Sequence, residues 1–179
     1  MRVVLGLDLG SRHTGFGIIR GDKEHLEHIS HGQITPSRGT SLENRLCQIY
    51  DGLGALIRGH QPQAVALEDI FLAANVKSAL VLGQVQGVAL LCAAQARLPV
   101  HLYPSLVVKK AVVGYGQASK AQVKLMVEHL LKVAVSGQHA ADALAVSLCH
   151  LFHTGSAIGN KAVENAHLSL KQHMQNYEL

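Results

Sequence analysis

The first part of the chain alternates short apolar runs with glycine-containing turns, a pattern typical of β-strands. Residues 3–9 and 16–20 form two such runs, separated by a turn that contains Gly10 and Gly15. A third stretch, residues 26–35, follows a short polar connection. Two tight connections in succession predict an antiparallel meander of three strands.

From residue 40 onward the apolar residues recur at the three- and four-residue steps of helices. Thr40 and Glu43 have the spacing of a capping box, in which Thr40 caps a helix that ends near His60. The pattern then predicts a strand at 64–68, a helix at 76–97, a strand at 100–103 and helices at 105–113, 119–132 and 139–153. A meander followed by helical crossovers predicts an α/β fold with a mixed, five-stranded sheet flanked by helices.

Length and polarity predict the domain organisation. A chain of 179 residues is long enough for one domain with a sizeable core. We expect this domain to span residues 1–154, and the polar, weakly periodic residues 155–179 to form a C-terminal tail. The longest apolar runs are shorter than the ~18–20 residues of a membrane span, and the start has no signal-peptide cleavage site. We therefore expect a cytoplasmic protein.

Charge and cysteine content exclude few classes of function. The net charge of +4 permits an anionic partner. Residues 109–132 contain one acid and a group of basic residues that suits either phosphate contacts or a solvated helix face, namely Lys109, Lys110, Lys120, Lys124 and Lys132. The cysteines lie in apolar helical patterns and are expected to be reduced and packed: Cys47, Cys92 and Cys149.

Three acidic residues lie in apolar runs, where an unpaired carboxylate is costly. Asp8 interrupts the first strand, Glu68 ends the strand at 64–68, and Asp142 lies among alanines of the last helix. Buried carboxylates are usually paired, protonated or bound to a cation. No lysine or arginine is obviously placed to neutralise these three, so a divalent metal is the simplest explanation.

The predicted topology allows the three acids to converge. The strands of Asp8, near the middle of its strand, and Glu68 can be neighbours, and His139 shares a helical face with Asp142. Oxygen ligands around an open site suit Mg²⁺ or Mn²⁺, and two ions about 3.5–4 Å apart can activate water for phosphodiester hydrolysis. Simpler structural roles remain open: caps of turns for Asp8 and Glu68, a helix N-terminal acid for Asp142, and a surface position for His139.

Four blocks of sequence, spanning about Val3 to Leu151, resemble the RuvC family of bacterial Holliday-junction resolvases. They are Gly6-Leu7-Asp8-Leu9-Gly10-Ser11-Arg12 with Thr14-Gly15; Leu67-Glu68-Asp69-Ile70-Phe71; Ser78-Ala79-Leu80 with Leu82-Gly83-Gln84 and Gly87-Val88; and Ala140-Ala141-Asp142-Ala143-Leu144-Ala145. The first block alone is weak, because many folds use an Asp-x-Gly turn. The four in this order and at this spacing are specific.

The resemblance implies a ribonuclease-H-like fold and a homodimer that nicks two strands of a four-way DNA junction symmetrically, using divalent metal. It implies that Asp8, Glu68 and Asp142 are catalytic, metal-binding acids. His139 stands where many members carry a fourth acid and some carry histidine. Because imidazole is a better ligand for Mn²⁺ than for Mg²⁺, we expect Mn²⁺ to support faster cleavage. The resemblance further implies cooperation with a branch-migration helicase complex.

The resemblance also indicates residues that contact DNA. Lys109 and Lys120 match basic positions near the family's active site, where lysine can hold the scissile phosphate or stabilise developing charge. Phe71 matches an aromatic residue that stacks on an unpaired base, a contact worth ~1–3 kcal/mol. The expected DNA contacts also include Lys110, Lys124 and Arg12.

Two glycines on the helix at 76–97 are spaced for close helix packing. Gly83 and Gly87 permit close approach either across a two-fold axis or against the chain's own sheet. The resemblance favours the two-fold axis of a dimer.

Three other functions compete with a junction resolvase. Asp8-x-Gly10 with Gly15 also resembles the phosphate loop of actin-like ATPases, of which this chain could hold only half. A junction-binding protein without cleavage, and a related nuclease acting on RNA or simple duplexes, are the remaining alternatives. In the tail, contact with DNA stays open for His167, Lys171 and His173.

Overall fold

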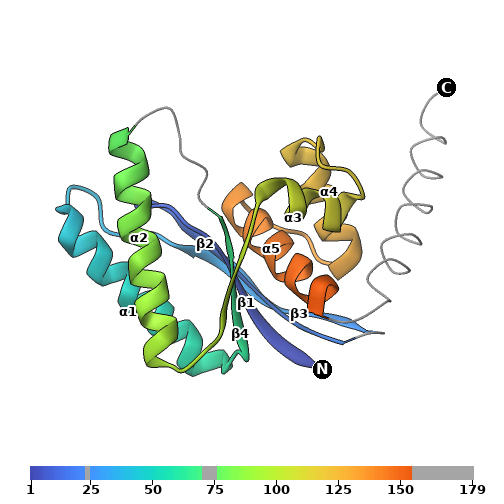
Figure 1. Ribbon diagram of the computed structural model, residues 1–179, viewed down its shortest axis with the longest axis horizontal. Helices are drawn as coiled ribbons and strands as arrows, with labels where there is room; N and C mark the ends of the chain where they lie inside the picture. The colour runs from blue at the N-terminus through green and yellow to red at the C-terminus, as the bar shows by residue number, and fades with distance from the viewer. Residues whose placement is uncertain (23–24, 70–75, 155–179) are drawn as a thin grey trace.

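The computed structural model describes residues 1–22, 25–69 and 76–154, in which one sheet lies between two layers of helices (Figure 1). The sheet has the strand order β3-β2-β1-β4-β5. Its strands are β1 (Arg2–Asp8), β2 (Thr14–Gly21), β3 (Leu26–Ile34), β4 (Ala64–Glu68) and β5 (Val100–Tyr103). The first three pair antiparallel, whereas β4 and β5 run parallel to β1. The predicted meander and mixed sheet are therefore confirmed.

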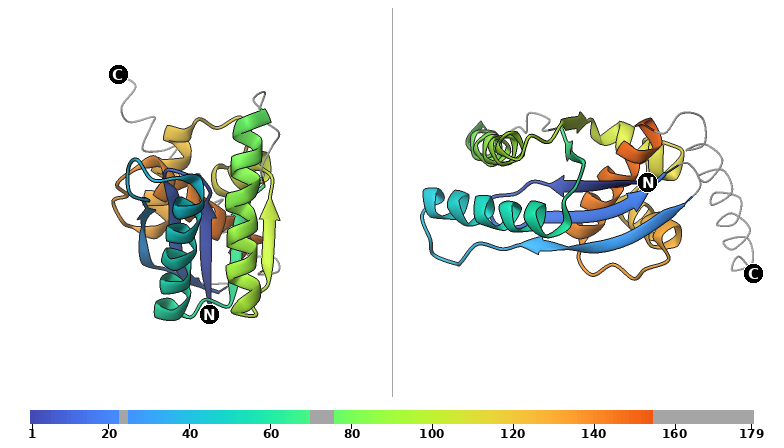
Figure 2. Two further views of the ribbon diagram at one scale, coloured as in Figure 1. Left: turned by 90° about the vertical axis from the view of Figure 1, so that its left-hand side faces the viewer. Right: turned by 90° about the horizontal axis from the view of Figure 1, so that it is seen from below.

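The helices divide between the two faces of the sheet (Figures 1 and 2). One face is covered by α1 (Leu42–His60) and α2 (Val76–Gln95). The other is covered by α3 (Ser105–Val113), α4 (Lys120–Leu131) and α5 (Gln138–Thr154). Neighbouring residues of β1 serve opposite faces, because Leu5 packs with the α1–α2 layer and Val4 with the α3–α5 layer. This double burial accounts for the nearly continuous apolar runs in the sequence.

The helix boundaries agree with the predicted spacing, but one predicted cap is wrong. The N-cap of α1 is Ser41, and the Thr40 hydroxyl instead donates a hydrogen bond to the Ser37 carbonyl at 2.8 Å. The cap of α4 is as predicted: the Ser119 hydroxyl accepts from the Gln122 amide, and the Gln122 side chain accepts from the Ser119 amide. Thr40 and Ser41 are adjacent and both types of residue are common N-caps, so the spacing alone predicted the wrong one of the two.

The cysteines are all free, but they do not share one environment. Cys92 and Cys149 are buried, as predicted, whereas Cys47 is exposed on α1. The prediction that all three pack as small hydrophobic side chains is therefore wrong for Cys47.

Helix α2 is apolar on both its inner and its outer side. Its inner side packs into the core through Val85, Ala89 and Cys92. By length and composition alone, α2 would also pass as a membrane span, with a mean hydropathy of 1.5, although only 22% of that window is buried in the fold. Its outer side exposes Val76 and Leu80, which are 73% and 65% accessible. An apolar outer side on a packed core helix indicates a second contact surface.

Helix α5 lies almost directly on the backbone of β1 and β2, as its alanines predicted. A Cβ on Gly6 would lie 2.2 Å from the Ala143 carbonyl oxygen, and one on Gly15 would lie 2.1 Å from the His139 carbonyl oxygen. The buried Ser147 hydroxyl donates to the Gly17 carbonyl at 2.9 Å and ties the helix to the sheet. The position of α5 over β1 is therefore set by backbone contact.

We predict that Gly6→Ala lowers the free energy of unfolding by about 2 kcal/mol or more, because the new methyl group would clash with helix backbone. Urea denaturation measures the change. The matched control is Gly59→Ala in α1, where a Cβ would meet nothing within 4 Å and alanine should be neutral or stabilise by up to ~1 kcal/mol. A Gly6→Ala protein as stable as the wild type would contradict this description of the α5 contact.

Candidate active site

A cavity of about 230 Å³ opens where β1 and β4 end beside the start of α5. Asp8 is the last residue of β1, not a mid-strand residue as predicted, and Glu68 is the last residue of β4. Because β1 and β4 are parallel neighbours, their carboxyl ends bring both acids to one edge of the sheet. Asp142 reaches the same cavity from α5, so the three predicted acids do line one site.

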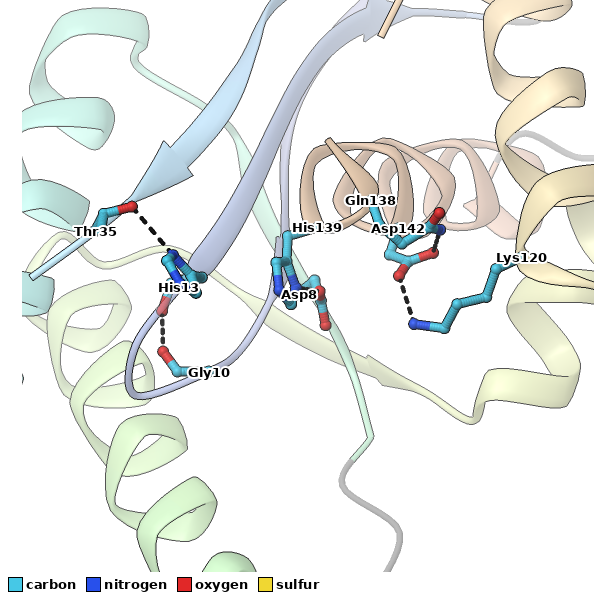
Figure 3. A network of polar contacts seen from close by, with 9 residues as sticks. Asp8, Gly10, His13, Thr35, Lys120, Gln138, His139 and Asp142 are labelled. Atoms are coloured by element: carbon cyan, nitrogen blue, oxygen red, sulfur yellow. Dashed lines mark hydrogen bonds and ion pairs between the residues drawn. The ribbon is translucent and has the colours of Figure 1, made fainter. Parts of the chain in front are cut away.

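Asp8 is paired with His139 across the first turn of α5 (Figure 3). The Nδ1 atom of His139 lies 2.6 Å from Oδ2 of Asp8. Because an ionised carboxylate only accepts hydrogen bonds, the ring donates from Nδ1 in this contact, and in the neutral form of the imidazole the lone pair is then on Nε2. The ring of His13 stacks on that of His139, with centroids 5.9 Å apart, and the Nδ1 atom of His13 lies 3.3 Å from the Thr35 hydroxyl. His139 is thus a positioned side chain rather than a free surface histidine.

Asp142 is held at both carboxylate oxygens (Figure 3). Lys120 Nζ donates to Oδ2 at 3.0 Å, and Gln138 Nε2 donates to Oδ1 at 2.8 Å. The expectation that no basic residue neutralises the acids is therefore wrong for Asp142. Lys120 lies 22 residues away in sequence on another helix, so no local pattern reveals the pair.

The charges that line the cavity favour the binding of a cation. Burial raises the pKa of Asp8, the hydrogen bond from His139 lowers it, and the negative charge of Asp142 raises it further. Burial likewise raises the pKa of Glu68, a hydrogen bond from Ser105 lowers it, and Asp8 and Asp142 raise it. The hydrogen bond to Asp142 raises the pKa of Lys120, and burial lowers it. One ammonium group thus offsets part of the repulsion among three carboxylates.

The donor chemistry suits a hard divalent ion, but the donors do not form a closed ligand set. Within the described ranges, no three His, Cys, Asp or Glu side chains are close enough together to hold one ion. The contacts explain why, because Asp142 is turned towards Lys120 and Gln138, and Asp8 is turned towards His139. Carboxylate oxygens and an imidazole nitrogen facing one open cavity fit Mg²⁺ or Mn²⁺ once these side chains turn inward.

The remaining predicted DNA-contacting residues differ in whether they line the cavity and in how exposed they are. Lys109 lines it together with Lys120, so both predicted basic residues of the site are present. Lys110 is exposed on α3, Lys124 is half-buried on α4, and Arg12 is exposed in the turn after β1. Phe71 lies outside the described residues, as do His167, Lys171 and His173 of the tail.

Three residues of the site were missed in the sequence. Gln138 precedes Asp142 by four positions, so helical spacing could have identified it. Ser105 and His13 carry no such signal, because they meet Glu68 and His139 only through the fold. Gln138 and Ser105 hydrogen-bond to the acids, and His13 stacks on His139.

Comparisons with known proteins identify the family. The family model described as "Crossover junction endodeoxyribonuclease RuvC" matches residues 4–150. A protein of that name from Koribacter versatilis is 48% identical over 87% of this chain and 95% of its own length. Another, from Geobacter sp. (strain M21), is 44% identical over 90% of this chain and 99% of its own length.

A solved structure shares both the fold and the sequence signal. It is the Thermus thermophilus RuvC in complex with a Holliday junction substrate, which is 30% identical with a TM-score of 0.82 over 86% of this chain and 95% of that chain. The ribonuclease-H-like sheet expected from the sequence is thereby confirmed. The family match over residues 4–150 and the relatives of 44% and 48% identity show that the chain belongs to the RuvC family of crossover junction endodeoxyribonucleases.

Proposed function

We propose that this protein resolves four-way DNA junctions by two symmetric, metal-dependent phosphodiester nicks during recombination and repair. The observation that carries the proposal is the cavity that Asp8, Glu68 and Asp142 line together with Lys120. Family membership supports it, as does the similarity to a RuvC solved with a Holliday junction substrate. The match over most of the chain leaves the half-ATPase alternative without support.

In this proposal the four donors Asp8, Glu68, His139 and Asp142 hold the metal. When bound, two Mg²⁺ or Mn²⁺ ions supply an activated water and a positive charge at the leaving oxygen. The chain's own contribution is orientation: Gln138, which is not itself a metal donor, holds one oxygen of Asp142. Such outer contacts matter, since losing one typically costs ~10–100-fold in metal affinity or activity.

Lys120 has two tasks in this site. Without metal its ammonium is bonded to Asp142 and is attracted by Asp8 and Glu68. Its side chain is 69% accessible, so it can turn outward without losing a buried contact. We propose that Lys120 then holds the scissile phosphate or stabilises its developing charge, with Lys109 beside it at the cavity wall.

We propose further that the outer side of α2 forms a homodimer interface. Apolar and small residues are exposed along it at helical steps of three and four: Val76, Leu80, Gly83, Gly87, Leu90 and Leu91. A Cβ on Gly83 or Gly87 would meet nothing within 4 Å, so the alternative that these glycines pack against the chain's own sheet is wrong. A second copy of this helix suits the stripe, because a two-fold dimer presents two active sites to two equivalent strands.

The domain, tail and partner assignments are also proposals. Residues 1–154 form the nuclease domain and residues 155–179 its tail, in a cytoplasmic, nucleoid-associated protein. Cooperation with a branch-migration helicase complex is proposed from family resemblance alone. Failure of immobilised protein to retain that complex from a cell extract, with or without junction DNA, would contradict the last assignment.

The first prediction concerns Asp8. Asp8→Asn should lower the rate of junction nicking by more than about 100-fold, because it removes a charged donor rather than an outer contact. The measurement is a denaturing gel of a labelled mobile four-way junction with Mg²⁺, Mn²⁺ or chelator. Asp51→Asn, the same change at an exposed position of α1, should nick at the wild-type rate.

Either alternative function would be visible in that experiment. Retardation of the junction without nicks in either metal would favour a junction-binding protein without cleavage. Equal nicking of a linear duplex or an RNA–DNA hybrid would favour the related nuclease.

The second prediction concerns metal preference. Because His139 offers nitrogen where many relatives are expected to offer oxygen, cleavage at saturating metal should be faster with Mn²⁺ than with Mg²⁺. His139→Asp should shift the preference towards Mg²⁺, as judged from the ratio of the two single-turnover rates. An equal or faster wild-type rate with Mg²⁺ would contradict the prediction.

The third prediction concerns the dimer. Leu80→Glu should dissociate it, because two carboxylates would face each other near the two-fold axis, and sedimentation velocity measures the mass. The control is Leu125→Glu on α4, a similarly exposed leucine outside the stripe, which should stay dimeric. A wild-type protein that sediments as a monomer at micromolar concentration would refute the assignment.

A further inference from the structure

A second apolar surface borders the active-site cavity, on the opposite layer from α2. Leu106 of α3 is 63% accessible, and Tyr115 of the following loop is 46% accessible. Leu106 lies between Ser105 and Lys109, which both line the cavity. Leu106 is thus exposed on the same turn of α3 that lines the cavity, where DNA would approach.

The loop after α3 folds back along that helix. Gly114 ends α3 in a left-handed conformation, with φ of 91°, and its amide donates to the Lys110 carbonyl. At Gly116 a Cβ would lie 3.2 Å from Leu106 Cδ2, so the loop backbone packs on Leu106. The loop, which carries Tyr115, is therefore held against the start of α3, where Ser105 and Lys109 line the cavity. We call Leu106 and the loop at 114–116 the α3 rim.

The α3 rim has the charge of a DNA-binding surface. Residues 104–127 contain no Asp or Glu and four lysines. Lys109 and Lys110 follow Leu106 by three and four positions and hence lie on its side of α3, and Lys120 begins the next helix. An exposed aromatic ring among unopposed lysines fits a nucleic-acid strand, which offers phosphates to the lysines and a flat base to the ring.

We propose that Tyr115 stacks on a nucleobase of the strand that is to be cut, and that the α3 rim thereby holds this strand over the cavity. The proposal rests on the proposed junction-cleaving function. Tyr115 makes no hydrogen bond or ring contact with another described residue, so its ring is available to a base. Phe71 belongs to a different segment of the chain, and Tyr115 would act in addition to it.

The composition of the chain allows a direct test. It contains no tryptophan, so Tyr115→Trp introduces a single indole at the rim. The substitution is made in the Asp8→Asn background with Mg²⁺, in which the junction should bind without being cut. Binding is followed by the anisotropy of a labelled four-way junction, and the indole emission is recorded in the same titration.

Two comparisons separate stacking from indirect effects. His60→Trp, at the end of α1 and far from the cavity in the fold, should show unchanged emission. Tyr115→Phe should bind the junction as the wild type does, whereas Tyr115→Ala should bind about 5- to 150-fold more weakly, the range expected for one lost base–aromatic contact. Thermal melting of each variant shows whether it is folded.

The possible results lead to different conclusions. Quenching of the rim indole on binding, together with weakened binding by folded Tyr115→Ala and not by Tyr115→Phe, would support the proposal. Normal junction binding with unquenched emission and an unaffected Tyr115→Ala would overturn it and leave the proposed function intact. A wild-type protein that does not bind the junction would overturn the proposed function and this inference with it.

Discussion

The contact between α5 and the backbone of β1 and β2 is the constraint on which the site depends. Side chains normally separate a helix from the sheet it packs on, but glycines at 6, 15 and 17 remove those side chains beneath the first half of α5. The helix that carries His139 and Asp142 can therefore come down beside the strand that carries Asp8. With ordinary side chains at these glycines, His139 could not reach Asp8 at 2.6 Å.

Without a metal, the carboxylates of the site repel one another, and the contacts within the site reduce this repulsion. The raised pKa values of Asp8 and Glu68 mean that their charged forms oppose folding as the pH rises above the usual carboxyl range. Lys120 relieves part of this by bonding to Asp142, so the metal-free site is self-neutralised in part. The same lysine competes with any incoming cation for Asp142. In the proposed function, metal binding and the release of Lys120 towards the phosphate would therefore be linked in one exchange.

The sequence was sufficient for the elements of the fold and for the acids of the site, for physical reasons. Strands buried on both faces and helices with one apolar side leave clear periodicities, and an acid inside an apolar run is conspicuous. Ser105, and the pairing of Lys120 with Asp142, could not be found in this way, because both contacts form only after distant segments pack. Thr40 misled because its spacing to Glu43 fits a capping box, although the helix is capped one residue later, at Ser41. Features that depend on one segment of the chain can be predicted from its sequence. Contacts between distant segments can be identified only once the fold is known.

The glycine contact also bears on how such a chain can change over time. Most crowded positions in a core tolerate a larger residue if a neighbour becomes smaller at the same time. Gly6 and Gly15 face the carbonyl oxygens of Ala143 and His139, and a main-chain oxygen cannot be made smaller by any substitution. No second mutation can therefore rescue a side chain at these two positions without moving the helix. Divergence must therefore leave both positions as glycine unless the helix itself moves away from the sheet.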